Sequence, residues 1–158
     1  MNASILLIIL LFGLIAPAIG ATKILQSSIP LWTDTVQTHR VGDHLVRIIN
    51  NFQDDLPDDQ SPFLEIELIK VPDRKLLDRL SINKVTVQLF GKKTVLDFRH
   101  SQMASIEDIK VINGIVHFNL FFASGAPAPT FNVDVACEVN ANLATLPQPQ
   151  CHEIKRRD

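Results

Sequence analysis

The sequence predicts an all-β protein, an antiparallel sandwich of two sheets with seven to eight strands. Three observations predict this class. Short segments alternate apolar and polar residues, glycine, proline and asparagine mark turns between them, and almost no segment repeats at helical spacing. A closed barrel built from the same strands is the alternative architecture.

Residues 106–122, IEDIKVINGIVHFNLFF, carry the clearest strand signal. The pair Asn113-Gly114 favours a two-residue type I′ turn, and such a turn fixes which residues lie opposite one another. Lys110 is then expected opposite His117, and Ile109 opposite Phe118. Because side chains alternate between faces, one face of this hairpin is predicted to be apolar and the other polar. The apolar face holds Ile109, Val111, Val116, Phe118 and Leu120, and the polar face holds Asp108, Lys110, His117 and Asn119.

The remaining chain is expected to add further strands and one helical segment. Residues 23–34 are expected to form an extended entry segment. In PDRKLLDRL, residues 72–80, three leucines lie at helical spacing behind Asp73, a suitable cap residue, so one or two helical turns are predicted there. Strands are predicted at 41–52, 63–71, 84–90, 94–100 and 131–139.

The chain begins with an apolar run at residues 5–15, followed by Pro17 and the small residues Ala18 and Gly20. This order is typical of a secretory signal peptide, so residues 1–20 are expected to be removed. A membrane anchor is the alternative, although the run is short for a transmembrane span and no second hydrophobic stretch follows. Residues 21–158 are then expected to form one secreted domain without a membrane segment.

Cys137 and Cys151 are the two cysteines of the chain. In an oxidising compartment an isolated pair is most simply one disulfide, and two free thiols are the alternative. Thirteen residues lie between them, and closing a loop of this size stabilises a fold by roughly 3 kcal/mol. A single bond leaves most of the stabilisation to the hydrophobic core.

The sequence lacks the usual marks of an enzyme, a metalloprotein or a nucleic-acid-binding protein. The net charge of −2 provides no basic face for nucleic acid, and neither a G-x-S-x-G elbow nor a glycine-rich phosphate loop occurs. An acidic loop and the pair His39 and His44 are the nearest approach to metal ligands, and solvated side chains are the simpler interpretation of both. No catalytic residue, cofactor or metal site is predicted. The acidic loop contains Asp54, Asp55, Asp58 and Asp59.

The interior is more informative than the polar residues. After the signal segment the chain holds eight phenylalanines and no tyrosine. Phe98, Phe118 and Phe131 are expected to point inward, and such an interior offers few polar groups. A cavity between the sheets would suit an acyl chain or a sterol. The alternative is that these side chains fill a close-packed core.

Four stretches carry a resemblance to a known family through their order along the chain. They are SSIPLWTDTVQTHRVGDHLVRI early in the chain, SPFLEIELIK in the middle, and APAPTFNVDVACEVN then PQCHEIK at the end. Together they resemble the MD-2-related lipid-recognition family, which consists of secreted, immunoglobulin-like sandwiches that hold lipid between their sheets. The resemblance implies this fold and a lipid ligand. It assigns no site residue, because lipid contacts in such proteins come from generic inward apolar positions.

The sequence therefore predicts a secreted, non-enzymatic β-sandwich that binds a lipid or other apolar ligand between its sheets. Residues 124–130 are the candidate mouth, since this glycine- and proline-rich loop leads into an inward-facing strand. The alternative is a solid-core sandwich that acts through its surface as an interaction or structural module. The predicted cavity-lining residues are Ile66, Phe98, Phe118, Leu120, Phe131 and Val133.

Overall fold

The structure is a computed structural model that describes residues 33–51, 63–89, 91–124 and 131–154. In these ranges the chain is all-β, with ten strands in two sheets and one short 3-10 segment, η1, at Phe98–His100. The strands are β1 Thr33–Val41, β2 His44–Asn51, β3 Leu64–Lys70, β4 Lys75–Ile82, β5 Lys84–Leu89, β6 Lys92–Asp97, β7 Ser101–Ile112, β8 Ile115–Ser124, β9 Asn132–Asn140 and β10 Gln150–Glu153.

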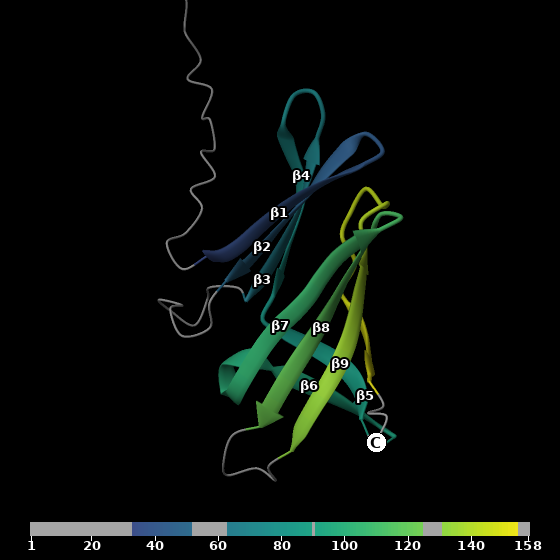
Figure 1. Cartoon of the computed structure of the whole chain (residues 1–158). Helices are drawn as coiled ribbons and strands as arrows, with labels where there is room; N and C mark the ends of the chain where they lie inside the picture. Colours follow the sequence, from purple (N-terminus) through teal and green to yellow (C-terminus); the bar gives the residue numbers. More distant parts are fainter. Residues whose placement is uncertain (1–32, 52–62, 90, 125–130, 155–158) are drawn as a thin grey trace, which may run out of the picture.

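The two sheets are of unequal size (Figure 1). A four-stranded sheet has the order β1-β2-β3-β4, and every neighbouring pair is antiparallel. A six-stranded, curled sheet has the order β6-β5-β10-β9-β8-β7, in which β10 runs parallel to β5 and every other pair is antiparallel. The predicted two-sheet, sandwich-like β-fold is thus confirmed, but the expected wholly antiparallel arrangement is wrong at the β5–β10 pair, which is parallel.

The core consists of the inward-facing side chains of both sheets. Burial alternates along the strands, as a sheet with one face on a core requires. In β9, for example, every second residue from Val133 to Val139 is buried, as the alternation predicted. Members of this core include Val46, Ile48, Leu64, Ile66, Leu68, Leu80 and Ile82 from the four-stranded sheet, and Val85, Val87, Leu96, Val116, Phe118, Leu120, Val133 and Val135 from the six-stranded sheet.

The β7–β8 hairpin turns where the sequence predicted. Asn113 and Gly114 both have positive φ, 51° and 76°, as a type I′ turn requires. Lys110 lies opposite His117, which confirms the register near the turn. Further from the turn the prediction is incomplete, because a bulge places both Asp108 and Ile109 against Phe118.

The predicted helical turns at 72–80 are wrong. Residues 75–82 form β4, which pairs with β3 over its whole length. Leu80 and Ile82 are buried at a spacing of two, whereas Leu76 and Leu77 remain exposed. Short leucine-rich segments fit both periods, and pairing with β3 decides between them because it supplies hydrogen-bond partners along one side of the β4 backbone.

Ten strands also exceed the seven to eight that were expected. Besides β4, the additional strands are β1 and β10. β1 is an edge strand with mostly exposed or half-buried side chains, so it has no alternation to detect. β10 is only four residues long and is held between β5 and β9 by contacts distant in sequence.

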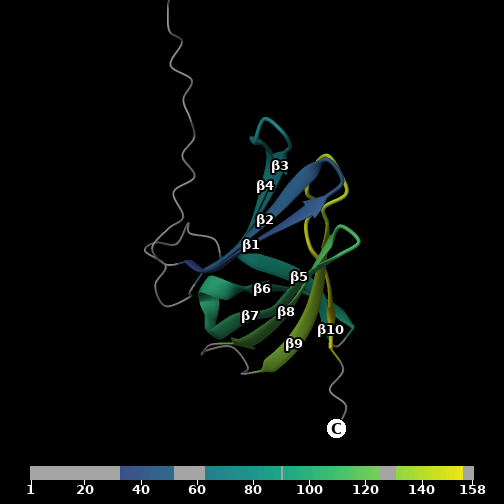
Figure 2. The ribbon, with the colours of Figure 1, turned by 45° about the horizontal axis from the view of Figure 1, so that its top comes forward.

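Three turns and one loop meet at one end of the sandwich (Figures 1 and 2). The β9–β10 loop connects both sheets there: Leu146 N donates to the Asp78 carboxylate of β4 at 2.7 Å, and Ala141 N donates to Gly114 O at 2.8 Å. We call this the turn end. It comprises the β1–β2, β3–β4 and β7–β8 turns, the β9–β10 loop and the strand ends that adjoin them, at residues 40–45, 70–78, 111–116 and 140–149.

The predicted disulfide is present. Cys137 in β9 and Cys151 in β10 lie directly opposite each other, with 4.2 Å between their Cα atoms. The bond ties the short β10 to the centre of the six-stranded sheet.

Reduction of this bond is expected to lower the free energy of unfolding by roughly 3 kcal/mol, because the unfolded chain regains the entropy of a closed loop. Chemical denaturation of the same protein with and without reductant measures the difference and avoids any substitution in the core. An unchanged denaturation midpoint would contradict the role assigned to the bond.

Gly114→Ala is expected to destabilise the fold more than Gly42→Ala does. Both glycines have positive φ, which costs a residue with a Cβ about 1–2 kcal/mol. At Gly114 an added Cβ would also overlap with the side-chain amide of Asn142, whereas at Gly42 nothing lies within 4 Å. The side chain of Asn142 would have to move, breaking its 2.9 Å hydrogen bond to Asn113 O, which adds about 1 kcal/mol. Urea denaturation of the two variants measures the difference, and equal losses would contradict the proposed contact.

Candidate functional site

The predicted cavity-lining residues lie in the interior, with one exception. Ile66, Phe98, Phe118 and Leu120 are at most 1% exposed, and Val133 is also buried. They come from β3, η1, β8 and β9, so both sheets contribute to one continuous apolar cluster. The exception is Phe131, which is half-buried and packs against this cluster from its border.

Polar side chains are nearly excluded from the space between the sheets. Among the described residues only Asn51, Glu67 and Ser124 are both polar and buried. Asn51 and Ser124 end their strands, and Glu67 alternates with the inward-facing Ile66 and Leu68, so it faces away from the core. The described interior is therefore almost entirely apolar.

The end of the β8–β9 hairpin borders the predicted mouth. Ser124 N donates to Phe131 O at 3.0 Å, and Phe131 N donates to Ser124 Oγ at 2.9 Å. The rings of Phe122 and Phe131 lie 6.0 Å apart at this border. The rest of the predicted mouth, 125–130, lies outside the described residues.

A hollow that the sequence did not indicate lies on the outer face of the six-stranded sheet. It has a volume of about 260 Å³ and spans β7, β8 and β9. Ala136 lies between longer neighbours and forms its floor, since it pairs with Asn119 on one side and His152 on the other. Its polar walls are Asp108, Lys110, His117, Asn119 and Glu138.

Two cross-strand contacts order the walls of this hollow. His117 Nδ1 lies 3.2 Å from Glu138 Oε1, and Asn119 Nδ2 donates to Asp108 Oδ2 at 3.1 Å. The register predicted for the hairpin already places Asp108, Lys110, His117 and Asn119 on one face. The contribution of Glu138 depends on β8 pairing with β9, which no short-range signal reveals.

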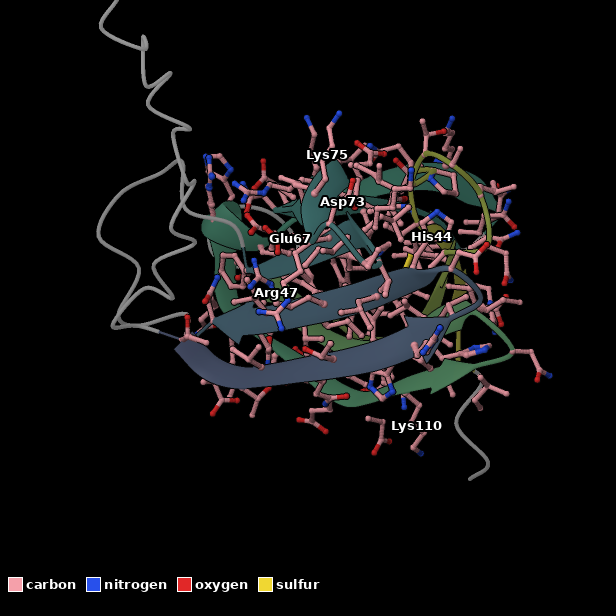
Figure 3. All side chains as sticks on the ribbon, turned by 90° about the horizontal axis from the view of Figure 1, so that it is seen from above. His44, Arg47, Glu67, Asp73, Lys75 and Lys110 are labelled. Carbon is pink, nitrogen blue, oxygen red and sulfur yellow. A yellow bond between two sulfur atoms is a disulfide. The ribbon has the colours of Figure 1, made fainter. Side chains whose placement is uncertain are left out.

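The outer face of the four-stranded sheet carries a cluster of charges around a fully buried carboxylate (Figure 3). Glu67 lies between Arg47 of β2 and Arg79 of β4 in one cross-strand row. Arg47 forms an ion pair with Glu67 Oε2, and Arg79 Nη2 lies 2.6 Å from Glu67 Oε1. Glu65, two residues earlier on the same face, lies 3.5 Å from Arg79 Nε.

Burial raises the pKa of the Glu65 carboxyl above its usual range. The positive charge of Arg79 opposes this effect, and the negative charge of Glu67 adds to it. The cluster is thus a set of mutually compensating charges on the sheet surface.

No group of three histidine, cysteine, aspartate or glutamate side chains suited to a metal ion occurs in the described ranges. The four aspartates of the acidic loop lie outside those ranges, and so does the predicted signal segment. His39 Nε2 lies 3.3 Å from Gln37 Oε1 on the edge strand β1. In the part of the chain that the structure describes, no helix has the length and apolarity to cross a membrane.

No protein-family model, curated protein or solved structure matches this chain. The resemblance to the MD-2-related lipid-recognition family stays a prediction.

Glu65→Gln is expected to stabilise the protein at neutral pH. Because the folded state raises the pKa of Glu65, the protonated form is favoured on folding. The resulting stability is fully present below the pKa of the unfolded chain and is lost as pH rises through the folded pKa. The glutamine variant should thus exceed the native protein in stability at neutral pH and match it in acid.

Denaturation of both proteins across the acidic to neutral range measures this difference. Glu107→Gln, at an exposed glutamate of β7, is the matched control for the change of side chain. A native protein that gains stability relative to Glu65→Gln as pH rises would contradict the assignment.

Proposed function

We propose that this protein is secreted, has no enzymatic activity and holds a lipid or other apolar ligand between its two sheets, as an immunoglobulin-like sandwich. One observation carries the proposal. The described side chains that are buried between the sheets are apolar, apart from Asn51 and Ser124 at strand ends. An acyl chain or sterol that entered this interior would leave no polar group of the protein unsatisfied.

The energetics of such a complex come from desolvation. Burial of apolar ligand surface contributes about 25 cal/mol per Å² removed from water, or about 0.8 kcal/mol for each methylene. The fully buried rings of Phe98 and Phe118 supply large apolar contact surface without a hydroxyl group. Phe131, half-buried beside Phe122, is the natural point at which a ligand would meet the interior.

Secretion is supported by two independent features of the chain. The first twenty residues have the order of a signal peptide. The bond between Cys137 and Cys151 fits an extracellular protein, since disulfides persist in oxidising compartments.

A second candidate function is an interaction module that acts through its surface. The hollow on the outer face of the six-stranded sheet favours it, because Lys110 and Glu138 there present charged groups to solvent beside the imidazole of His117. This candidate needs no ligand between the sheets. The two functions are therefore separable by a test of the interior.

The direct test is native mass spectrometry of protein secreted by a eukaryotic host, followed by organic extraction. A bound species of lipid mass that is lost on denaturation is the expected result. Protein that carries no such species and takes up no fluorescent fatty acid would contradict the proposal and favour the surface module.

Substitutions locate the ligand. Val133→Phe and Phe118→Trp add volume at inward positions, so each is expected to reduce uptake of a fluorescent fatty acid by about tenfold or more, because overpacking an occupied interior typically costs 1–3 kcal/mol. Val95→Phe makes the same change as the first variant at a side chain that is 57% exposed, and it should leave uptake unchanged.

Thermal unfolding of all three variants establishes that each is folded. Unchanged uptake by both folded interior variants would place the ligand elsewhere.

A further inference from the structure

The turn between β3 and β4 projects from the turn end of the sandwich (Figures 1 and 2). From Lys70 to Leu77 its sequence is KVPDRKLL, and every residue except half-buried Val71 is exposed. Three of these residues are basic, and Asp73 is the single acidic residue. The hairpin tip thus combines positive charge with exposed aliphatic side chains.

A bulge in β4 exposes two consecutive leucines. Leu68 pairs with Asp78 and Ile69 pairs with Leu76, so Leu77 is the extra residue in β4. A regular strand would turn one of two successive side chains toward the core. Here Leu76 is 37% exposed and Leu77 is 39% exposed. The bulge therefore presents aliphatic surface that the core does not use.

The β1–β2, β7–β8 and β9–β10 connections also expose basic or aliphatic side chains. Val71 N donates to Asp43 O at 3.2 Å, which holds the β1–β2 turn and its exposed Arg40 beside the hairpin tip. Ile112 at the β7–β8 turn is 52% exposed, and Leu143 in the β9–β10 loop is 47% exposed. Of the eight exposed large hydrophobic side chains in the described ranges, half lie at the turn end.

Positive charge is concentrated at the hairpin tip. From Lys70 to Leu77 three basic residues and one acidic residue give a net charge of +2, although the whole chain has −2. Over the whole turn end four basic and three acidic residues give a net charge of +1. Figure 3 looks onto this end and shows Lys75 at its margin with Asp73 and His44 further inside. The basic residues are Arg40, Lys70, Arg74 and Lys75, and the acidic ones are Asp43, Asp73 and Asp78.

We propose that the turn end, led by the β3–β4 hairpin tip, docks the protein on the surface of a bilayer that contains anionic lipids. Basic side chains are attracted to anionic headgroups, and exposed leucines are stabilised at the boundary between headgroups and acyl chains. The exposed leucines and basic side chains come from several separate connections at one end. A broad surface such as a bilayer can therefore contact all of them at once. This docking does not depend on a ligand between the sheets.

Sedimentation of the full secreted protein with vesicles tests the proposal. Vesicles of phosphatidylcholine with phosphatidylserine should bind the protein, and vesicles of phosphatidylcholine alone should bind it much less. Lys70→Glu with Lys75→Glu is expected to weaken binding to anionic vesicles by at least about tenfold, since each basic residue near such a surface contributes roughly fivefold. Lys92→Glu with Lys93→Glu, on exposed positions of β6 at the β5–β6 turn, changes the net charge equally and should stay within about twofold.

A second pair of variants tests insertion of the aliphatic side chains. Leu76→Ser with Leu77→Ser should reduce the binding that persists at high salt, where electrostatic attraction is screened. Val95→Ser, at a side chain that is 57% exposed on β6, should not. Circular dichroism and thermal unfolding establish that each variant is folded.

Three results would overturn the proposal. One is the absence of any binding of the native protein to anionic vesicles. Another is an equal loss in both charge-reversal variants, which would reduce the effect to net charge. The third is saturable binding of an acidic polypeptide at the turn end that vesicles do not displace, which would make this end a protein-docking surface.

Discussion

The placement of one sheet against the other depends on the connection at Asn83, where the chain crosses between them. β4 ends at Ile82 in one sheet and β5 begins at Lys84 in the other, so a single residue joins them. Asn83 O accepts from Phe98 N at 2.9 Å, and its side-chain oxygen accepts from Phe63 N at 3.1 Å. One residue thus bonds to segments that adjoin both sheets. The rings of Phe63 and Phe98 then meet edge to face, with centroids 5.2 Å apart.

Two bulges, in β7 and β4, place side chains on the surface that regular strand alternation would not place there. In β7 the extra residue lies at the outer hollow, where Asp108 adopts a positive φ of 53° and its carboxylate accepts from Asn119. In β4 the extra residue is Leu77, which leaves an aliphatic pair in solvent. Each bulge interrupts the alternation in one strand while its partner strand keeps its apolar face on the core. Both proposed surface features therefore arise where the ladder is irregular and the core is unaffected.

Local signals predicted those parts of the fold that local interactions determine. The β7–β8 turn follows from Asn113 and Gly114, and the inward set of β9 follows from strict alternation. By contrast, β10 is held by partners distant in the sequence, namely β5 and Cys137, and nothing in its four residues indicates a strand. The candidate interior residues Ile66, Phe118, Leu120 and Val133 were predictable because they follow the same alternation within their strands. The outer hollow was not predictable, because it forms only once β7, β8 and β9 lie side by side in the sheet.

The register of the four-stranded sheet is fixed by two features. One is the apolar face that packs on the core, and the other is the buried carboxylate of Glu67 on the opposite face. Leu64, Ile66 and Leu68 fill the core, and Glu65 and Glu67 alternate with them on the outer face. A slip of one residue would carry both carboxylates into an interior with no polar partners, at a cost of several kcal/mol for each charge. In the native register Glu67 instead meets Arg47 and Arg79 from both neighbouring strands. An apolar residue at this position would remove that penalty and leave two arginines without their shared carboxylate. The cluster thus restricts the pairing of β2, β3 and β4 to one alignment, which in turn fixes where the β3–β4 turn lies and which of its side chains reach solvent.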